Sequence, residues 1–135
     1  MIMRAREDVI TDLVKQWLAK AEADFGLAEH LVSEGRYLDA VGFHTQQAAE
    51  KFLKAFLVHH QIEFPKTHNL GELLDLVARA DRALADSLRS ATELNPYGAD
   101  IRYPGDLPEM TADRASSALA LAAQVREGIY TALTG

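Results

Sequence analysis

Residues 37–61, YLDAVGFHTQQAAEKFLKAFLVHHQ, determine the fold class that the sequence predicts. This stretch contains no proline and a single glycine, Gly42, and it ends shortly before Pro65, so one long helix is expected from Tyr37 to Gln61. Its apolar residues form a helical stripe with a broad flank: Tyr37, Val41, Ala48, Phe52 and Ala55 in the stripe, and Phe43, Leu53, Phe56 and Leu57 in the flank. An apolar surface of this width predicts a helix that is central in its own bundle or buried against a second subunit.

The segment before this helix shows the pattern of a second long helix. Its apolar residues recur every three or four positions, at Ile10, Leu13, Val14, Trp17, Leu18, Ala21, Phe25, Ala28 and Val32. Gly35 follows the last of them and can adopt the positive φ that ends a helix, so residues 33–36 are expected to form a tight turn.

Three further helices are expected downstream. Asn69, with Glu72 three residues later, predicts the capped start of a short helix that continues through Val77. A helix is expected over residues 82–94, because Pro96 disfavours helical backbone at Asn95. Residues 95–109, NPYGADIRYPGDLPE, are predicted to be a functional loop, since they contain three of the four prolines.

Thr111 can cap the last helix, which has one apolar stripe consisting of Ala115, Ala118, Leu119, Ala122, Val125, Ile129 and Leu133. About five helices and no strands are therefore expected.

Composition limits the class of protein. With 135 residues, 48% of them hydrophobic, the chain can fill one core, so residues 1–135 are expected to be a single domain. Charges interrupt every apolar stretch before it could cross a bilayer, so we expect no membrane association and a cytoplasmic location. The absence of cysteine excludes disulfides and thiolate metal sites. A net charge of -6 argues against a general DNA-binding role, and any nucleic-acid contact must use a local basic cluster.

Two segments and a short motif resemble a known family. They are residues 35–54, GRYLDAVGFHTQQAAEKFLK, residues 65–74, PKTHNLGELL, and residues 101–104, IRYP. In combination they resemble the HEPN domains, the higher eukaryote and prokaryote nucleotide-binding domains, and the likeness extends from Trp17 through the last helix. The resemblance implies an all-α, up-and-down bundle of four long helices and one short helix, commonly a homodimer. Many prokaryotic relatives are encoded beside a minimal nucleotidyltransferase, as a two-component module or toxin-antitoxin pair.

Many HEPN proteins are metal-independent ribonucleases that contain an arginine, four to six residues and then a histidine. This spacing is absent here, because Arg102 is followed by YPGDLPE and no histidine lies beyond His68. The nearest pair, Arg36 and His44, is separated by seven residues. The resemblance therefore implies the branch of small HEPN proteins in which an RYP loop replaces the nuclease motif, and we predict no catalytic residue.

Gln46, Glu50, Lys51 and Lys54 match the most recognisable helix of the family, which implies polar groups lining a cleft at a dimer or partner surface. On spacing alone, Glu50 and Lys54 form an ordinary solvated ion pair, because residues four positions apart share a helix face. The sequence is compatible with both interpretations.

His68 follows Lys66 and Thr67 at the start of the short third helix, where a phosphate could meet a basic side chain, backbone N–H donors and the positive end of the helix. Alternatively, Thr67 or Asn69 caps the helix and His68 makes one hydrogen bond that closes the loop. The adjacent residues His59 and His60 point to different helix faces, so no metal site is expected, and no cofactor is predicted.

Arg102 and Tyr103 lie in the proline-rich loop. An arginine beside an aromatic ring suits a phosphate and a stacked base. Equally, Arg102 could hold the loop on the bundle by pairing with Asp100, Asp106 or Glu50.

Three functional hypotheses follow. The first is a non-catalytic module that binds a nucleotide or RNA together with a nucleotidyltransferase partner. The second is a ribonuclease toxin in which Arg102 acts with Asp106 or Glu109, although an exposed carboxylate titrates too low to shuttle protons near neutral pH. The third is a purely structural dimer.

Overall fold

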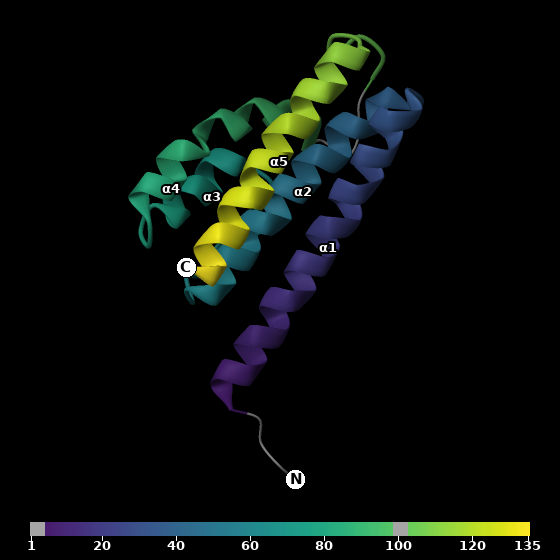
Figure 1. The fold of residues 1–135 in the computed structure, drawn as a ribbon. Coiled ribbons are helices and arrows are strands. Elements are labelled where there is room, and N and C mark those ends of the chain that lie inside the picture. The colour runs from purple at the N-terminus through teal and green to yellow at the C-terminus, as the bar shows by residue number, and fades with distance from the viewer. Residues whose placement is uncertain (1–4, 99–102) are drawn as a thin grey trace.

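The computed structural model describes residues 5–98 and 103–135, which form an all-helical bundle with no strand in these two ranges (Figure 1). The helices in chain order are α1 (Arg6–Glu34), α2 (Leu38–His59), α3 (Leu70–Val77), α4 (Arg82–Ser87), the 3-10 helix η1 (Arg89–Gly98) and α5 (Ala112–Thr134). The long helices α1, α2 and α5 lie side by side, and α3, α4 and η1 pack together beside α2 and α5. The predicted all-α bundle is confirmed.

Helix α2 lies at the centre of the bundle. Of its 22 residues, 13 are buried, including the four large apolar residues Phe52, Leu53, Phe56 and Leu57. The covering surfaces come from α1, α3, η1 and α5 of the same chain. The wide apolar surface of α2 is therefore covered by its own chain, and no second subunit is needed to bury it.

The turn between α1 and α2 forms where the sequence predicts it. Gly35 has φ 66°, and its N–H donates to the carbonyl oxygen of Leu31 at 2.9 Å. Glycine adopts this left-handed conformation without the steric cost that a Cβ imposes, so α1 ends here. The following helix begins after Tyr37, which also has a positive φ of 54°.

The single helix predicted over residues 82–94 is wrong. The structure has two elements there, α4 and η1, and η1 continues through Pro96 to Gly98 into the segment predicted to be a loop. The buried residues of this stretch, Leu88, Ala91 and Leu94, recur every three positions. A 3-10 helix has three residues per turn and places such residues on one face, whereas an α-helix would turn them apart. Tertiary burial thus selects the tighter helix.

Two predicted helix caps are confirmed. The side chain of Asn69 accepts a hydrogen bond from the N–H of Glu72 at 3.1 Å, and Thr111 accepts from the N–H of Arg114 at 3.1 Å. Each satisfies a donor that the first turn of a helix leaves unpaired. These caps fix where α3 and α5 begin.

In the two described ranges, no helix combines the length and the apolar character that crossing a bilayer requires.

Candidate functional site

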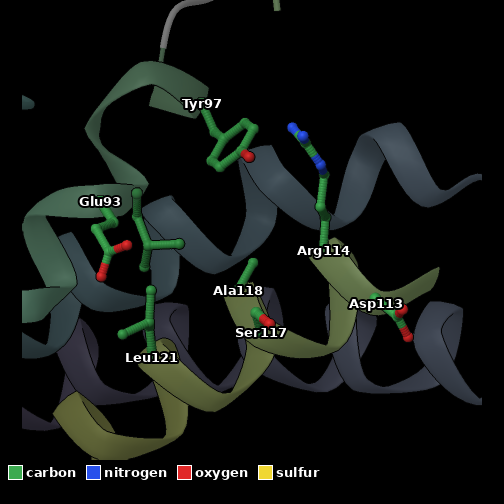
Figure 2. Close-up of a pocket in the computed structure, with 8 residues that line it drawn as sticks. Glu93, Tyr97, Asp113, Arg114, Ser117, Ala118 and Leu121 are labelled. Atoms are coloured by element: carbon green, nitrogen blue, oxygen red, sulfur yellow. The ribbon is translucent and has the colours of Figure 1, made fainter. Parts of the chain in front are cut away.

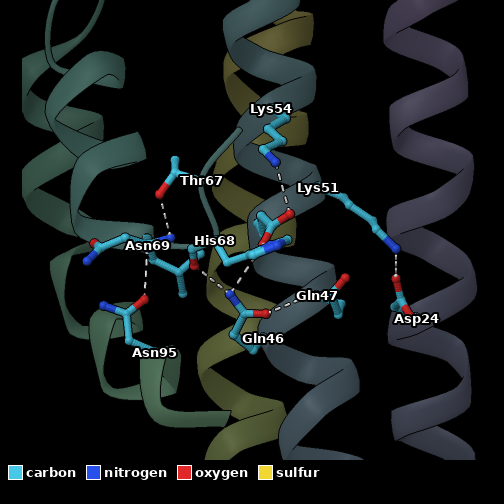
Figure 3. Close-up of polar contacts among 11 residues, drawn as sticks. Asp24, Gln46, Gln47, Lys51, Lys54, Thr67, His68, Asn69 and Asn95 are labelled. Carbon is cyan, nitrogen blue, oxygen red and sulfur yellow. Dashed lines mark hydrogen bonds and ion pairs between the residues drawn. The ribbon is translucent and has the colours of Figure 1, made fainter. Parts of the chain in front are cut away.

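Four of the predicted site residues contact one another and form what we call the Glu50 network (Figure 3). Gln46, Glu50 and Lys54 belong to α2, and His68 lies in the connector beside it. The Lys54 ammonium donates to Glu50 Oε2 at 3.0 Å, and His68 Nδ1 lies 2.8 Å from Glu50 Oε1. Gln46 Nε2 donates to the backbone carbonyl of His68 at 2.8 Å and approaches Glu50 Oε1 at 3.4 Å. The network joins the centre of α2 to the connector that precedes α3.

Three of the four residues of the Glu50 network are buried, and its charges are paired internally. Gln46, Glu50 and Lys54 are 0%, 3% and 6% exposed, whereas the side chain of His68 is 63% exposed. The Lys54 ammonium also lies 5.5 Å from the ring centre of Trp17 and 5.6 Å from that of Phe64. A phosphate at Lys54 would have to displace a buried carboxylate, so this geometry is that of a structural ion pair.

Lys51 points away from the network, toward α1 (Figure 3). Its ammonium donates to Asp24 Oδ2 at 2.5 Å, and Asp24 Oδ1 lies 2.8 Å from His44 Nδ1. These contacts tie α1 to α2 and leave Lys51 outside any common site with Lys54.

Three backbone donors at the start of α3, the N–H groups of Asn69, Leu70 and Glu72, are already taken by side chains. Thr67 accepts from the N–H of Asn69 at 3.1 Å, and Asn95 of η1 accepts from the N–H of Leu70 at 2.8 Å. With Asn69 accepting from Glu72, the geometry matches the capping alternative for this segment. A phosphate at this helix end would have to compete with these side chains for the three N–H groups.

The predicted loop residues are only partly described. Arg102 and Asp100 lie outside the described residues. Tyr103 is 72% exposed, and its backbone N–H donates to Asp106 Oδ2 at 2.9 Å. Asp106 therefore holds the turn at residues 103–106.

A groove that the sequence did not predict lies around Tyr97, between η1, the first turns of α5 and the loop of residues 103–110. We call it the Tyr97 groove. It consists of two cavities that share Tyr97 and measure about 240 Å³ and about 610 Å³. The smaller is lined by Glu93, Leu94, Tyr97, Asp113, Arg114, Ser117, Ala118 and Leu121, and the larger by Asp39, Tyr97, Tyr103, Pro104, Gly105, Leu107, Pro108, Glu109 and Met110. Figure 2 shows the Arg114 side chain rising from α5 beside the Tyr97 ring.

Close packing against α2 positions Tyr97. A Cβ on Gly42 would lie 2.7 Å from Tyr97 Cδ1, and a Cβ on Gly98 would lie 2.8 Å from the Gln46 amide carbon. Only glycine permits η1 to approach α2 this closely. A glycine inside a helical pattern does not by itself predict such a contact, because a Cβ on Gly26 of α1 would meet no atom within 4 Å, so the groove had no signal in the sequence.

The lining of the groove suits a planar ligand better than a dense cluster of phosphates. Tyr97 and Tyr103 offer aromatic rings, while Asp39, Glu93, Asp113 and Glu109 accompany Arg114. Carboxylates accept hydrogen bonds from the amino groups of bases, and arginine pairs with phosphate. Among the residues that the structure describes, no three His, Asp or Glu side chains gather as metal ligands.

A family model described as HEPN domain matches residues 14–130. Neither the search of curated proteins nor that of solved structures found a match.

Proposed function

The chain belongs to the HEPN domain family, and from this premise we propose that it is a non-catalytic module that binds RNA or a nucleotide in the Tyr97 groove. One observation supports this location above all. It is the arrangement of Arg114 beside Tyr97, whose ring lines this cavity and also the larger one that Tyr103 lines. Arginine and aromatic rings together suit a phosphate and an unstacked base.

The chemistry of the chain argues against catalysis. Metal-free RNA cleavage needs a group that moves protons near neutral pH, and histidine is the usual one. The five histidines of the sequence all lie within residues 30–68. His68 is engaged with Glu50 in the Glu50 network, and His44 is engaged with Asp24. None of these histidines lines the groove.

We extend the proposal to partners, namely a second copy of the chain and a minimal nucleotidyltransferase. The first turns of α1 extend beyond the end of α2 (Figure 1), and Val9 and Leu13 there are 42% and 41% exposed. Leu27, 41% exposed, lies on the same helical face as Val9, because 18 residues complete five turns. With α2 covered by its own chain, this face of α1 is the candidate surface for assembly. A mass near twice 14.9 kDa at micromolar concentration is expected, and a monomer there would remove the dimer.

The binding proposal is tested by titrating AMP and a short labelled RNA against the wild type, Tyr97→Ala and Arg114→Ala. Each variant is expected to bind the RNA roughly 5- to 150-fold more weakly, which is the range for loss of one stacking or charge-assisted contact. Arg82→Ala is the matched control, because Arg82 is an exposed arginine on α4 outside the groove. Equal affinities for all four proteins would reject the groove.

The non-catalytic part is tested by incubating the wild type and Arg102→Ala with labelled RNA in EDTA. No cleavage is expected from either protein. Cleavage by the wild type that Arg102→Ala abolishes would establish the ribonuclease alternative.

A further inference from the structure

Tyr37 occupies a position that local physics disfavours for tyrosine. Its φ of 54° and ψ of 42° place it in the left-handed region, where residues other than glycine and asparagine are strained. It is also the N-cap of α2, a position that prefers Ser, Asp or Asn, and its side chain makes no capping hydrogen bond. The ring is 70% exposed, so core packing does not offset these costs. A residue that breaks several local preferences without a gain in packing points to a role in binding.

Arg36 contacts Tyr37, and the two side chains form one surface. Its guanidinium lies 5.2 Å from the centre of the Tyr37 ring, and its Nη2 donates to the Tyr37 hydroxyl at 3.3 Å. The two exposed side chains therefore present a flat ring and a fixed positive charge together. We call this pair the Arg36–Tyr37 corner.

The corner adjoins the Tyr97 groove. Asp39, two residues after Tyr37, lines the larger cavity together with Tyr103. Two residues span at most about 7 Å of backbone, so the Cα atom of Tyr37 lies within that distance of the Cα atom of Asp39 in the groove wall. In Figure 1 the turn between α1 and α2 lies at the same end of the bundle as the loop that leads into α5.

We infer that Arg36 and Tyr37 form a second base-stacking subsite, and that the ligand is a single-stranded RNA segment of more than one nucleotide. This inference rests on the proposed function, because the first base occupies the Tyr97 groove. A neighbouring base stacks on Tyr37, and Arg36 pairs with the phosphate between the two bases. A mononucleotide reaches only the groove and gains nothing from the corner.

The charges near the groove set how the ligand is held. Four carboxylates line the groove and repel phosphate, so Arg36 and Arg114 are the residues expected to contact the phosphates. Stacking is expected to supply most of the affinity. For single-stranded nucleic acid, each neutralised phosphate contributes about 0.7 to the slope of log affinity against log salt. Removing Arg36 should lower this slope by about 0.7.

The test compares AMP with a tetraadenylate RNA on the wild type, Tyr37→Asn, Tyr37→Phe and Arg36→Ala. Asparagine tolerates the positive φ and removes the ring, whereas phenylalanine keeps the ring. Tetraadenylate should bind the wild type more tightly than AMP does. Tyr37→Asn should weaken tetraadenylate binding roughly 5- to 150-fold and leave AMP binding unchanged, while Tyr37→Phe should retain tetraadenylate binding.

Other outcomes overturn the inference in distinguishable ways. If the wild type binds AMP and tetraadenylate equally, or if Tyr37→Asn binds tetraadenylate as the wild type does, the corner is not a subsite and the groove proposal stands. If the wild type binds neither ligand, both proposals fail. If Tyr37→Asn instead halves the mass of the protein in solution, the corner is a protein interface and the RNA subsite is rejected.

Discussion

The Glu50 network and the Arg36–Tyr37 corner differ in what their side chains face. The residues of the network were predicted as site residues, whereas Tyr37 of the corner was predicted to lie in an apolar stripe and is instead exposed. In the network, Glu50 and Lys54 are nearly completely buried and satisfy each other. In the corner, Tyr37 is 70% exposed in a strained conformation. Polar residues of a recognisable motif can thus be structural, and our proposal assigns ligand binding instead to an exposed residue that breaks local preferences. A substitution in the network should lower the free energy of unfolding, whereas the substitution Tyr37→Asn should raise it.

The largest effect is expected from Glu50→Gln. The substitution leaves the Lys54 ammonium, whose side chain is 8% exposed, without its carboxylate. Breaking one partner of a buried ion pair costs roughly 3–5 kcal/mol, which urea denaturation would measure. The double variant Glu50→Gln/Lys54→Met removes both charges and should recover much of the loss. A double variant no more stable than Glu50→Gln would show that the pair is not the cause.

Two glycine substitutions test the contact between α2 and η1. In Gly42→Ala the new Cβ would lie 2.7 Å from the Tyr97 ring, and overpacking of this kind costs about 1–3 kcal/mol, partly offset by the better helix propensity of alanine. In the matched control Gly26→Ala, on α1, no atom lies within 4 Å of the new Cβ, so a gain of about 0.5–1 kcal/mol is expected. Thermal unfolding of both variants measures the difference. Equal shifts would mean that Tyr97 does not pack on Gly42.

The corner should respond in the opposite direction to the network. Asparagine adopts the left-handed conformation at a lower cost than tyrosine does, so in Tyr37→Asn the free energy of unfolding should rise by about 1 kcal/mol. The same variant is expected to lose affinity for tetraadenylate. A fall in stability would mean that Tyr37 packs as a structural residue, and the contrast between the two regions would fail.

The smallest effect concerns a cluster of intermediate exposure between α1 and α5. The Tyr130 hydroxyl donates to Glu22 Oε1 at 3.1 Å, and burial, followed by this hydrogen bond, raises the pKa of Tyr130 above its ordinary value of 10.0. The folded state therefore holds the phenol proton more tightly than the unfolded state does. Its contribution is present below about pH 10 and is lost as the pH rises through the folded pKa. In Tyr130→Phe the melting temperature should fall less steeply as the pH rises above about 10. If the fall is as steep as in the wild type, groups other than Tyr130 cause it.

Much of the fold was predictable because its determinants are local. The apolar repeats located α1, α2 and α5, and the caps at Asn69 and Thr111 located the starts of α3 and α5. The helix over residues 82–94 was not predictable in the same way. In this stretch a buried residue recurs every three positions because α2 and α5 cover one face of it, and this spacing favours a 3-10 helix.

The candidate site, like the fold, was predictable only where it depends on local sequence. The sequence placed Gln46, Glu50 and Lys54 on one helix and His68 at the start of another, but it could not say that Glu50 would be buried among them. Arg114, Tyr97 and Asp39 belong to three different elements and share no motif. Spacing along the chain therefore could not predict that Tyr97 would line one cavity with Arg114 and a second with Asp39.

What the sequence determined by itself is the all-α class, the central helix and the family, since periodicity, capping and motif are properties of neighbouring residues. Only the tertiary structure decided which polar groups became internal partners and which remained available to a ligand. The physical reason is that burial and pairing depend on the surfaces that distant segments bring together. Here those surfaces meet where Gly42 and Gly98 let η1 lie closely against α2.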